Sequence, residues 1–279
     1  MLVTSHASSQ AQTPTLALKE FGTTDSTAYF VTSTLIVGPT EVLLWDAQMT
    51  SNDAARLADT IAATHRKLEA IVISHPDHDH FMGAATILKR FPGTPVYMTP
   101  AAIAVFNGKT SGVVAWVHKL FQSVVTPTPL PSNHLAVDGV DVEVIPDLGG
   151  DVVTPTNSIL WIPSLNTVLA ADVVFNGIHP WLGSSDPASR ERWHQSLRQI
   201  ASLHPAAVVA GHKRHIDAAD SPDILAFMDQ YLTAFDSAVK AGPDAATVAK
   251  TMEAKYPQLA VRMLLDYSSK VAFHQASMQ

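Results

Sequence analysis

The stretch Ser74-His75-Pro76-Asp77-His78-Asp79-His80 decides how this chain of 279 residues is interpreted. It follows the apolar run Ala70–Ile73 and precedes a segment with helical character over 83–90. Without a cation, so many ionisable groups on one short turn would repel each other or change protonation state. Imidazole nitrogens and carboxylate oxygens are ligands of zinc, iron and manganese. An exposed His-rich loop is the alternative, but the order of strand, ligand cluster and helix favours a metal site.

Composition limits the class of protein. The chain is 47% hydrophobic, enough for a large core, and its net charge of −7 argues against nucleic-acid or anionic-membrane partners. No apolar stretch approaches the roughly 20 residues of a membrane span. Because cysteine is absent, any metal must be bound through nitrogen and oxygen. We expect a soluble protein of the cytoplasm or the periplasm that acts on a small molecule.

Alternating strands and helices predict a layered α/β fold. Residues 1–15 are expected to be a flexible N-terminus, 16–217 the main domain and 218–279 a helical segment packed on it. The expected strands cover 15–20, 28–37, 41–45, 70–74, 95–98, 140–145, 158–162, 168–171 and 206–210. The expected helices cover 53–65, 83–90, 101–122, 187–203, 222–241, 243–255 and 257–277.

Three further metal-capable side chains follow apolar strands. Asp151 comes after Gly149-Gly150, Asp172 ends the run 168–171, and His212 follows Gly211. Any one of them alone could be a helix cap or an ordinary loop residue. Their shared position just past a strand is harder to obtain by accident, because layered α/β folds collect metal ligands at the ends of several strands. We therefore expect them to join the cluster at 75–80.

With these residues in order, the chain resembles the metallo-β-lactamase superfamily from about 16 to 216. The family signature is His-x-His-x-Asp-His after a strand, then a His after Gly, then an Asp at a strand end, then a final Gly-His. The matching residues are His75, Asp79, His80, Asp172 and Gly211-His212, and Asp46 matches an acid at an early strand end. The resemblance implies a four-layer αββα sandwich with two mixed sheets between helices, and extra helices at the C-terminus.

Two positions depart from the family pattern. Asp77 stands where the second His belongs, and His78 falls on a variable position. A ligand at His78 would break the alternate-residue spacing from His75, which favours Asp77. Asp151 stands in place of the usual His after Gly, with Asp147 as the alternative. The resemblance implies one ion held by His75, Asp77 and Asp151, a second held by Asp79, His80 and His212, and Asp172 as the bridge.

The expected cofactor is a divalent metal, zinc with iron or manganese as alternatives, at up to two ions per chain. Carboxylates in place of two imidazoles make the site harder and more anionic, which raises the pKa of a bound water. The resemblance implies hydrolysis of an ester, lactone or amide-type small molecule by a metal-bound hydroxide. Asp79 would hold the second ion and orient the hydroxide. His179 is the candidate for the leaving-group side, with a purely structural role as the alternative.

Two other functions of the same fold stay open. One is a mononuclear iron dioxygenase acting on thiols, which bound iron and oxygen uptake would reveal. The other is a non-catalytic metal-binding member, in which the two His-to-Asp changes mark a decayed site. The sequence has no Gly-x-Ser-x-Gly turn and no Gly-rich Lys-Ser/Thr loop, so a serine nucleophile has no support.

Overall fold

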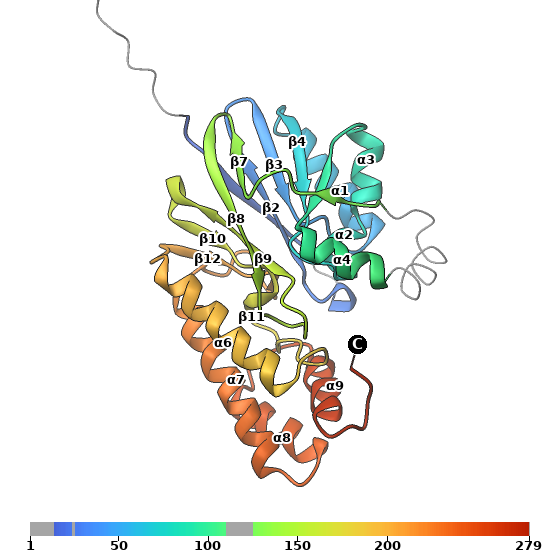
Figure 1. The fold of residues 1–279 in the computed structure, drawn as a ribbon, viewed down its shortest axis with the longest axis vertical. Helices are drawn as coiled ribbons and strands as arrows, with labels where there is room; N and C mark the ends of the chain where they lie inside the picture. Colours follow the sequence, from blue (N-terminus) through green and yellow to red (C-terminus); the bar gives the residue numbers. More distant parts are fainter. Residues whose placement is uncertain (1–13, 24–25, 110–124, 279) are drawn as a thin grey trace, which may run out of the picture.

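The computed structural model describes residues 14–23, 26–109 and 125–278 (Figure 1). Two mixed sheets lie face to face, with helices on the outer side of each. The four-layer fold expected from the sequence is therefore confirmed. Residues 1–13 of the expected flexible terminus, and 110–122 of the expected helix over 101–122, lie outside the described residues.

The first sheet has six strands in sequential order. They are β1 (Ala17–Gly22), β2 (Thr32–Val37), β3 (Glu41–Trp45), β4 (Lys67–Val72), β5 (Val96–Met98) and β6 (Thr128–Pro129). The first three strands are antiparallel, and β3 to β6 are parallel. Parallel neighbours need a crossover, and helices supply it: α1 (Ser51–Ala62), the single turn α2 (His78–Phe81), α3 (Ala84–Arg90) and α4 (Pro100–Lys109).

The second sheet has five strands in the order β12-β10-β9-β8-β7. Their bounds are β7 (His134–Val137), β8 (Val140–Leu148), β9 (Asn157–Ile162), β10 (Thr167–Leu169) and β12 (Ala207–Val209). The strand β12 is parallel to β10, and the helix α6 (Pro187–Ser202) lies between them in sequence. A short parallel pair, β11 (Phe175–Asn176) with β13 (His212–Lys213), lies beyond the end of this sheet. Single turns of 3-10 helix are η1 (Ser26–Ala28), η2 (Pro163–Leu165) and η3 (Ala171–Val173).

Side-chain alternation along the central strands separates three hydrophobic layers. On β3, Leu43 packs between the sheets while Leu44 faces the helices α1 and α3. On β9, Leu160 packs between the sheets while Ile159 faces the helices of the second half. Each sheet therefore has two buried faces, and the ends of its strands are the place where polar groups can gather.

The C-terminal part is helical, as expected. Its helices are α7 (Asp223–Ala241), α8 (Ala245–Lys255) and α9 (Arg262–Ala272). In Figure 1, α6 and α7 run side by side along the outer face of the second sheet. One hydrophobic cluster contains side chains from α6, α7 and α8. The proposed boundary between 217 and 218 stays a prediction. No described helix has both the length and the apolar character needed to cross a bilayer.

Several expected element bounds differ from the structure, and three of the differences concern the backbone near the site or the C-terminal helices. The strand expected over 28–37 begins only at Thr32, because Tyr29 and Phe30 have left-handed backbone with φ of 53° and 57°. Asp172 lies in the turn η3 rather than at a strand end. The last helix begins at Arg262 rather than 257, because Val261 also has left-handed backbone, at φ 57°. Sequence patterns carry little information on such backbone reversals at non-glycine residues.

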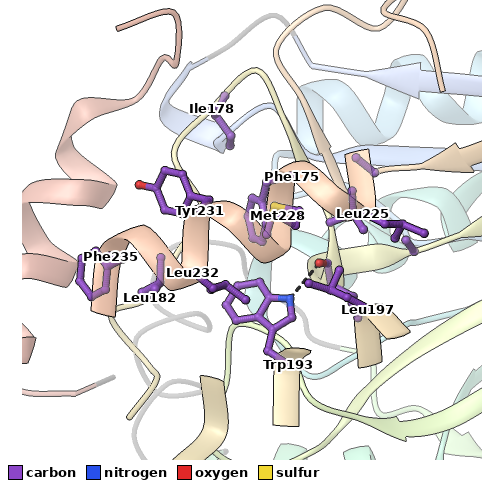
Figure 2. Close-up of a cluster of buried hydrophobic side chains, with 14 of the residues drawn as sticks. Phe175, Ile178, Leu182, Trp193, Leu197, Leu225, Met228, Tyr231, Leu232 and Phe235 are labelled. Carbon is purple, nitrogen blue, oxygen red and sulfur yellow. Dashed lines mark hydrogen bonds between the residues drawn. The ribbon is translucent and has the colours of Figure 1, made fainter. Parts of the chain in front are cut away.

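Trp193 joins α6 to the turn that carries Asp172. It is fully buried in the cluster of Figure 2, with its ring centroid 6.2 Å from that of Phe175 of β11 and with side chains of α7 in the same cluster. Its indole Nε1 donates a hydrogen bond of 2.8 Å to the carbonyl of Val173 in η3 (dashed line in Figure 2). A side chain of the outer helix layer is therefore hydrogen-bonded to the turn that contains Asp172.

We expect Trp193→Phe to lower the free energy of unfolding by about 1–3 kcal/mol, because it leaves the buried Val173 carbonyl without a donor. Chemical denaturation monitored by circular dichroism measures this change. Trp161→Phe on β9, where the indole is half-buried, is the matched control and is expected to cost less. Equal losses in the two variants would show that the bond to Val173 contributes nothing specific.

Candidate metal centre

The loop after β4 is fixed by a single buried carboxylate at the end of β3. Asp46 is fully buried, with left-handed backbone at φ 61°. Its Oδ1 accepts the backbone N–H of Ser74, and its Oδ2 accepts the Ser74 hydroxyl, both at 2.8 Å. The same Oδ2 lies 2.8 Å from Nδ1 of His80. Asp46 therefore holds both ends of the loop that carries the first four candidate ligands.

The hydrogen bonds around the histidines determine where their protons lie. The only hydrogen of the Ser74 hydroxyl points to Asp46, so its oxygen accepts from Nδ1 of His75 at 2.9 Å. Nδ1 of His80 donates to Asp46, and Nδ1 of His212 donates to the carbonyl of Tyr29 at 2.7 Å. In each neutral imidazole the Nε2 atom then carries a lone pair, the form that binds metal.

The Nε2 atoms and four carboxylates lie together. Ligand atoms within 4.8 Å of one another form three groups: His75, Asp77 and Asp151; Asp79, His80 and His212; and His75, His80 and Asp172. Asp172 lies between the first two groups. Its Oδ1 is 3.1 Å from Nε2 of His80, and its Oδ2 is 3.1 Å from Nε2 of His212 and 3.8 Å from Nε2 of His75. The structure thus gathers all seven side chains that the sequence singled out as ligands.

Several of these atoms have no hydrogen bond to compensate their burial. Within the described part of the chain, His75 Nε2, His80 Nε2 and Asp172 Oδ1 are buried without a hydrogen-bond partner. When the imidazole is neutral, the lone pairs on its Nε2 and on a carboxylate oxygen about 3 Å away repel each other, whereas a proton or a metal ion between them is attracted by both. With nitrogen and oxygen donors in two groups of three, the residues fit one or two divalent ions.

Charges inside the cluster shift the pKa values of its members in opposite directions. Burial, and after it the charges of Asp172 and Asp77, raises the pKa of Asp151 well above its usual value. For Asp172, burial acts to raise the pKa. The positive charges of His212 and His80 have a larger combined effect and hold the pKa of Asp172 well below its usual range. The first group therefore contains carboxylates whose mutual repulsion a divalent ion would relieve.

The structure also separates the alternatives left open by the sequence. Asp151 is buried and receives a hydrogen bond of 3.0 Å from Nδ2 of Asn157, whereas Asp147 is exposed. Asp77 belongs to a group of ligand atoms, and His78 belongs to none of the groups found among the described residues. Asp151 and Asp77 are therefore the ligands that the geometry favours.

A glycine before the last histidine allows the two loops to meet. A Cβ atom at Gly211 would lie 2.4 Å from the carbonyl carbon of Ala171 and 2.5 Å from Oδ1 of Asp172. Only a residue without a side chain fits there. The Gly-His pair thus brings His212 against Asp172 through close backbone approach.

His179 does not lie where the sequence placed it. Its Nδ1 is 2.8 Å from the hydroxyl of Tyr231 on α7, and its backbone N–H donates to the carbonyl of Ala260. Burial, and after it the charge of Arg262, lowers its pKa to about 4. It is not among the residues that line the cavity above the ligand groups. The contacts give His179 a packing role, and its expected part on the leaving-group side has no geometric support.

The ligand groups open into a cavity of about 820 Å³. Its floor contains Asp77, Asp79, Asp151, Asp172 and His212. Its walls include Tyr29, Phe175 and Trp181, together with side chains of α9. Phe175 is stacked on the ring of His212, with centroids 5.0 Å apart and planes at 4°. A cavity of this size suits a small molecule.

Comparison with known proteins agrees with this geometry. A family model described as the metallo-beta-lactamase superfamily matches residues 26–212. The chain belongs to this superfamily. A comparison with curated proteins found no match.

Solved structures of the superfamily share the fold. A metallo-beta-lactamase family protein from Thermus thermophilus is similar with a TM-score of 0.67 and 16% identity, over 91% of each chain. A beta-lactamase domain protein from Burkholderia ambifaria gives 0.65 and 14%, over 87% of this chain and 80% of that chain. The DIM-1 metallo-beta-lactamase exposed to ceftazidime gives 0.59 and 14%, over 80% and 98%. At such low identities the likeness shows the fold alone.

Sequence reasoning missed the groups that hydrogen-bond the candidate ligands of this superfamily member. Ser74 stands inside the quoted stretch, but its link between Asp46 and His75 depends on the folded loop. The carbonyl of Tyr29 cannot be recognised from a side-chain pattern at all. Asn157, which holds Asp151, lies at the start of an ordinary apolar strand.

We expect Asp46→Asn to weaken metal binding by about 10- to 100-fold, the usual effect of losing a ligand-orienting partner. If the amide oxygen keeps the bond to the backbone of Ser74, the amide nitrogen faces Nδ1 of His80. That nitrogen must then become an acceptor, which moves the proton to Nε2 and removes its lone pair. Calorimetric titration with zinc measures the affinity. Unchanged affinity would mean that Asp46 does not set the tautomer of His80.

Asp77→His should bring the first group closer to the family pattern. We expect tighter zinc binding and an altered preference among zinc, iron and manganese, because a neutral soft ligand replaces a hard anionic one. Competition titrations with a chromogenic chelator measure both quantities. His78→Asn, one residue away, is the control and should leave zinc affinity unchanged. The reverse pattern would identify His78 as the ligand.

Proposed function

We propose that the chain is a metal-dependent hydrolase of an uncharged ester, lactone or amide-type small molecule. The observation that supports this most is the pair of three-residue ligand groups joined by Asp172 at the floor of the cavity. His75, Asp77 and Asp151 would hold one ion, and Asp79, His80 and His212 the other. We propose zinc as the metal, with iron and manganese as alternatives that an oxygen-rich ligand set also suits.

The charge of the floor supports a neutral substrate. The ligand groups contain the carboxylates of Asp77, Asp79, Asp151 and Asp172 and three imidazoles, which would be neutral with Nε2 bound to a metal. Their four negative charges would balance two divalent ions, so the loaded site would carry no excess positive charge to attract a polyanion. Esters and lactones are therefore preferred to phosphodiesters.

The residues of the chain position the reacting groups. Bound divalent ions supply Lewis acidity and an activated water nucleophile. The carboxylate of Asp79 lines the cavity with its Oδ2 3.4 Å from Nε2 of His212, and we assign it to orient the attacking water by accepting a hydrogen bond. Burial, and after it the charge of Asp79, raises the pKa of the Tyr29 phenol. Tyr29 therefore stays protonated and can donate a hydrogen bond to a developing oxyanion.

Two observations support hydrolysis over the two alternative functions that the sequence left open. A mononuclear iron enzyme needs a single ligand group, whereas the geometry offers two on either side of Asp172. A decayed site has no need of the bonds that orient its histidines, whereas His75, His80 and His212 are each held through Nδ1.

A panel of aryl esters, lactones, β-lactams and phosphodiesters tests the proposal. We expect turnover of esters and lactones by metal-loaded protein, its loss on chelation and its return when zinc is added. Asp79→Asn should lower kcat by at least about 100-fold, the order of magnitude of a lost proton-handling group. Oxygen uptake with a thiol and no hydrolysis across the panel would instead support the iron dioxygenase.

A further inference from the structure

An aromatic pair forms one wall of the cavity. Trp181, in the loop before α6, and Tyr267 of α9 both line the cavity and stack with ring centroids 5.2 Å apart at 26°. The indole Nε1 of Trp181 donates to the hydroxyl of Ser184, and the Tyr267 hydroxyl donates to the carbonyl of Ser277, each at 2.9 Å. Because these polar atoms already have partners, the pair offers the cavity its carbon surface.

The two rings pack against the backbone of Gly183, where a side chain would not fit. A Cβ atom there would lie 2.5 Å from two ring atoms of Trp181 and 2.9 Å from Cδ1 of Tyr267. The backbone of Gly183 is not in the left-handed region. Close approach of the two rings, rather than backbone conformation, therefore accounts for a glycine at this position.

The wall continues along α9. Met263 and Leu264 line the cavity on the same helix as Tyr267, and the Met263 side chain is 59% exposed. An exposed, flexible thioether adapts to apolar ligands of different shape. Asp266 and Lys270, which carry opposite charges, also line the cavity, and Oδ1 of Asp266 accepts a hydrogen bond of 2.9 Å from Nε of Arg262.

We propose that this apolar wall, defined as Trp181, Met263, Leu264 and Tyr267, binds the hydrocarbon part of the substrate while the scissile carbonyl lies at the ligand groups. The inference rests on the proposed function and adds the substrate class: neutral esters or lactones with a long alkyl or aryl substituent. The wall and the ligand groups line one continuous cavity of about 820 Å³, far larger than a scissile group alone requires.

Binding of ester isosteres that cannot be hydrolysed tests the wall directly. Phenyl alkyl ketones with alkyl chains of two, four and eight carbons are titrated calorimetrically into zinc-loaded protein. We expect affinity to rise roughly two- to fourfold for each methylene that the wall buries. Gly183→Ala, which forces the aromatic pair apart, and Met263→Gln should each flatten this series. Their effect on affinity should be smallest for the shortest ketone and should grow with chain length.

The matched control is Met278→Gln, the same substitution at another exposed methionine, 44% exposed and not among the residues that line the cavity. It should keep the full chain-length series. The proposal would be overturned if affinity does not rise with chain length in the unchanged protein. It would also be overturned if the rise is the same in both Gly183→Ala and Met263→Gln. If Gly183→Ala does not fold, Met263→Gln alone decides, because Met263 is 59% exposed and its replacement leaves the packed core unchanged.

Kinetics on 4-nitrophenyl acetate, butyrate and octanoate separate the two proposals. If the wall binds the acyl chain, KM falls from acetate to octanoate, and Met263→Gln removes that fall, whereas Met278→Gln keeps both the fall in KM and the kcat for acetate. Ester hydrolysis with a KM that does not change with chain length would contradict the proposed binding wall but support the proposed hydrolase activity. If ketone affinity rises with chain length and this rise depends on Met263, but no ester of any length is hydrolysed, the result would support the proposed binding wall and contradict the proposed hydrolase activity.

Discussion

Three imidazole nitrogens and four carboxylates converge where the two sheets end. Such an arrangement is unfavourable in a buried place unless positive charge lies between the groups. Much of the surrounding structure keeps it in place nonetheless. Asp46, Ser74 and the carbonyl of Tyr29 take up the Nδ1 side of each ring, so the opposite nitrogens can turn only toward Asp172. The helix layers matter to the site for the same reason, since Trp193 holds the turn that carries Asp172.

The candidate ligands are shared between the sheets. His75, Asp77, Asp79 and His80 follow β4 of the first sheet, and Asp151, Asp172 and His212 follow strands of the second. Polar bonds join the two sides next to them. Ser158 of β9 donates its backbone N–H and its hydroxyl to the carbonyl of Ser74, and Thr32 of β2 donates to the carbonyl of Gly211. The distance between the ligand groups is therefore set by how the sheets pack.

Local spacing explains what could be predicted from the sequence. Ligands on one loop, such as His75 and Asp79, need only a strand before them to be placed together. Asp172 and His212 could be added because each follows an apolar run, and strand ends in layered folds converge. Three kinds of feature could not be predicted. Left-handed backbone at Tyr29 and Phe30 gives no residue signal, and yet it precedes the strand that binds Gly211. His179 follows Asp172 closely in the chain but turns toward Tyr231. The apolar wall includes side chains of α9, a helix that packs beside the cavity but lies far along the chain from the motif at 75–80.

Division of the ligand groups between the sheets has a consequence for folding. An ion bound by His75, Asp77 and Asp151 would join loops of the two sheets that are far apart along the chain, as a disulfide does. The chain has no cysteine with which to make such a link covalently. Metal would thus act as a removable cross-link, and resistance to unfolding would follow the concentration of free metal. With no metal bound, the loops of the two sheets would lack this link, and the protein would unfold more easily.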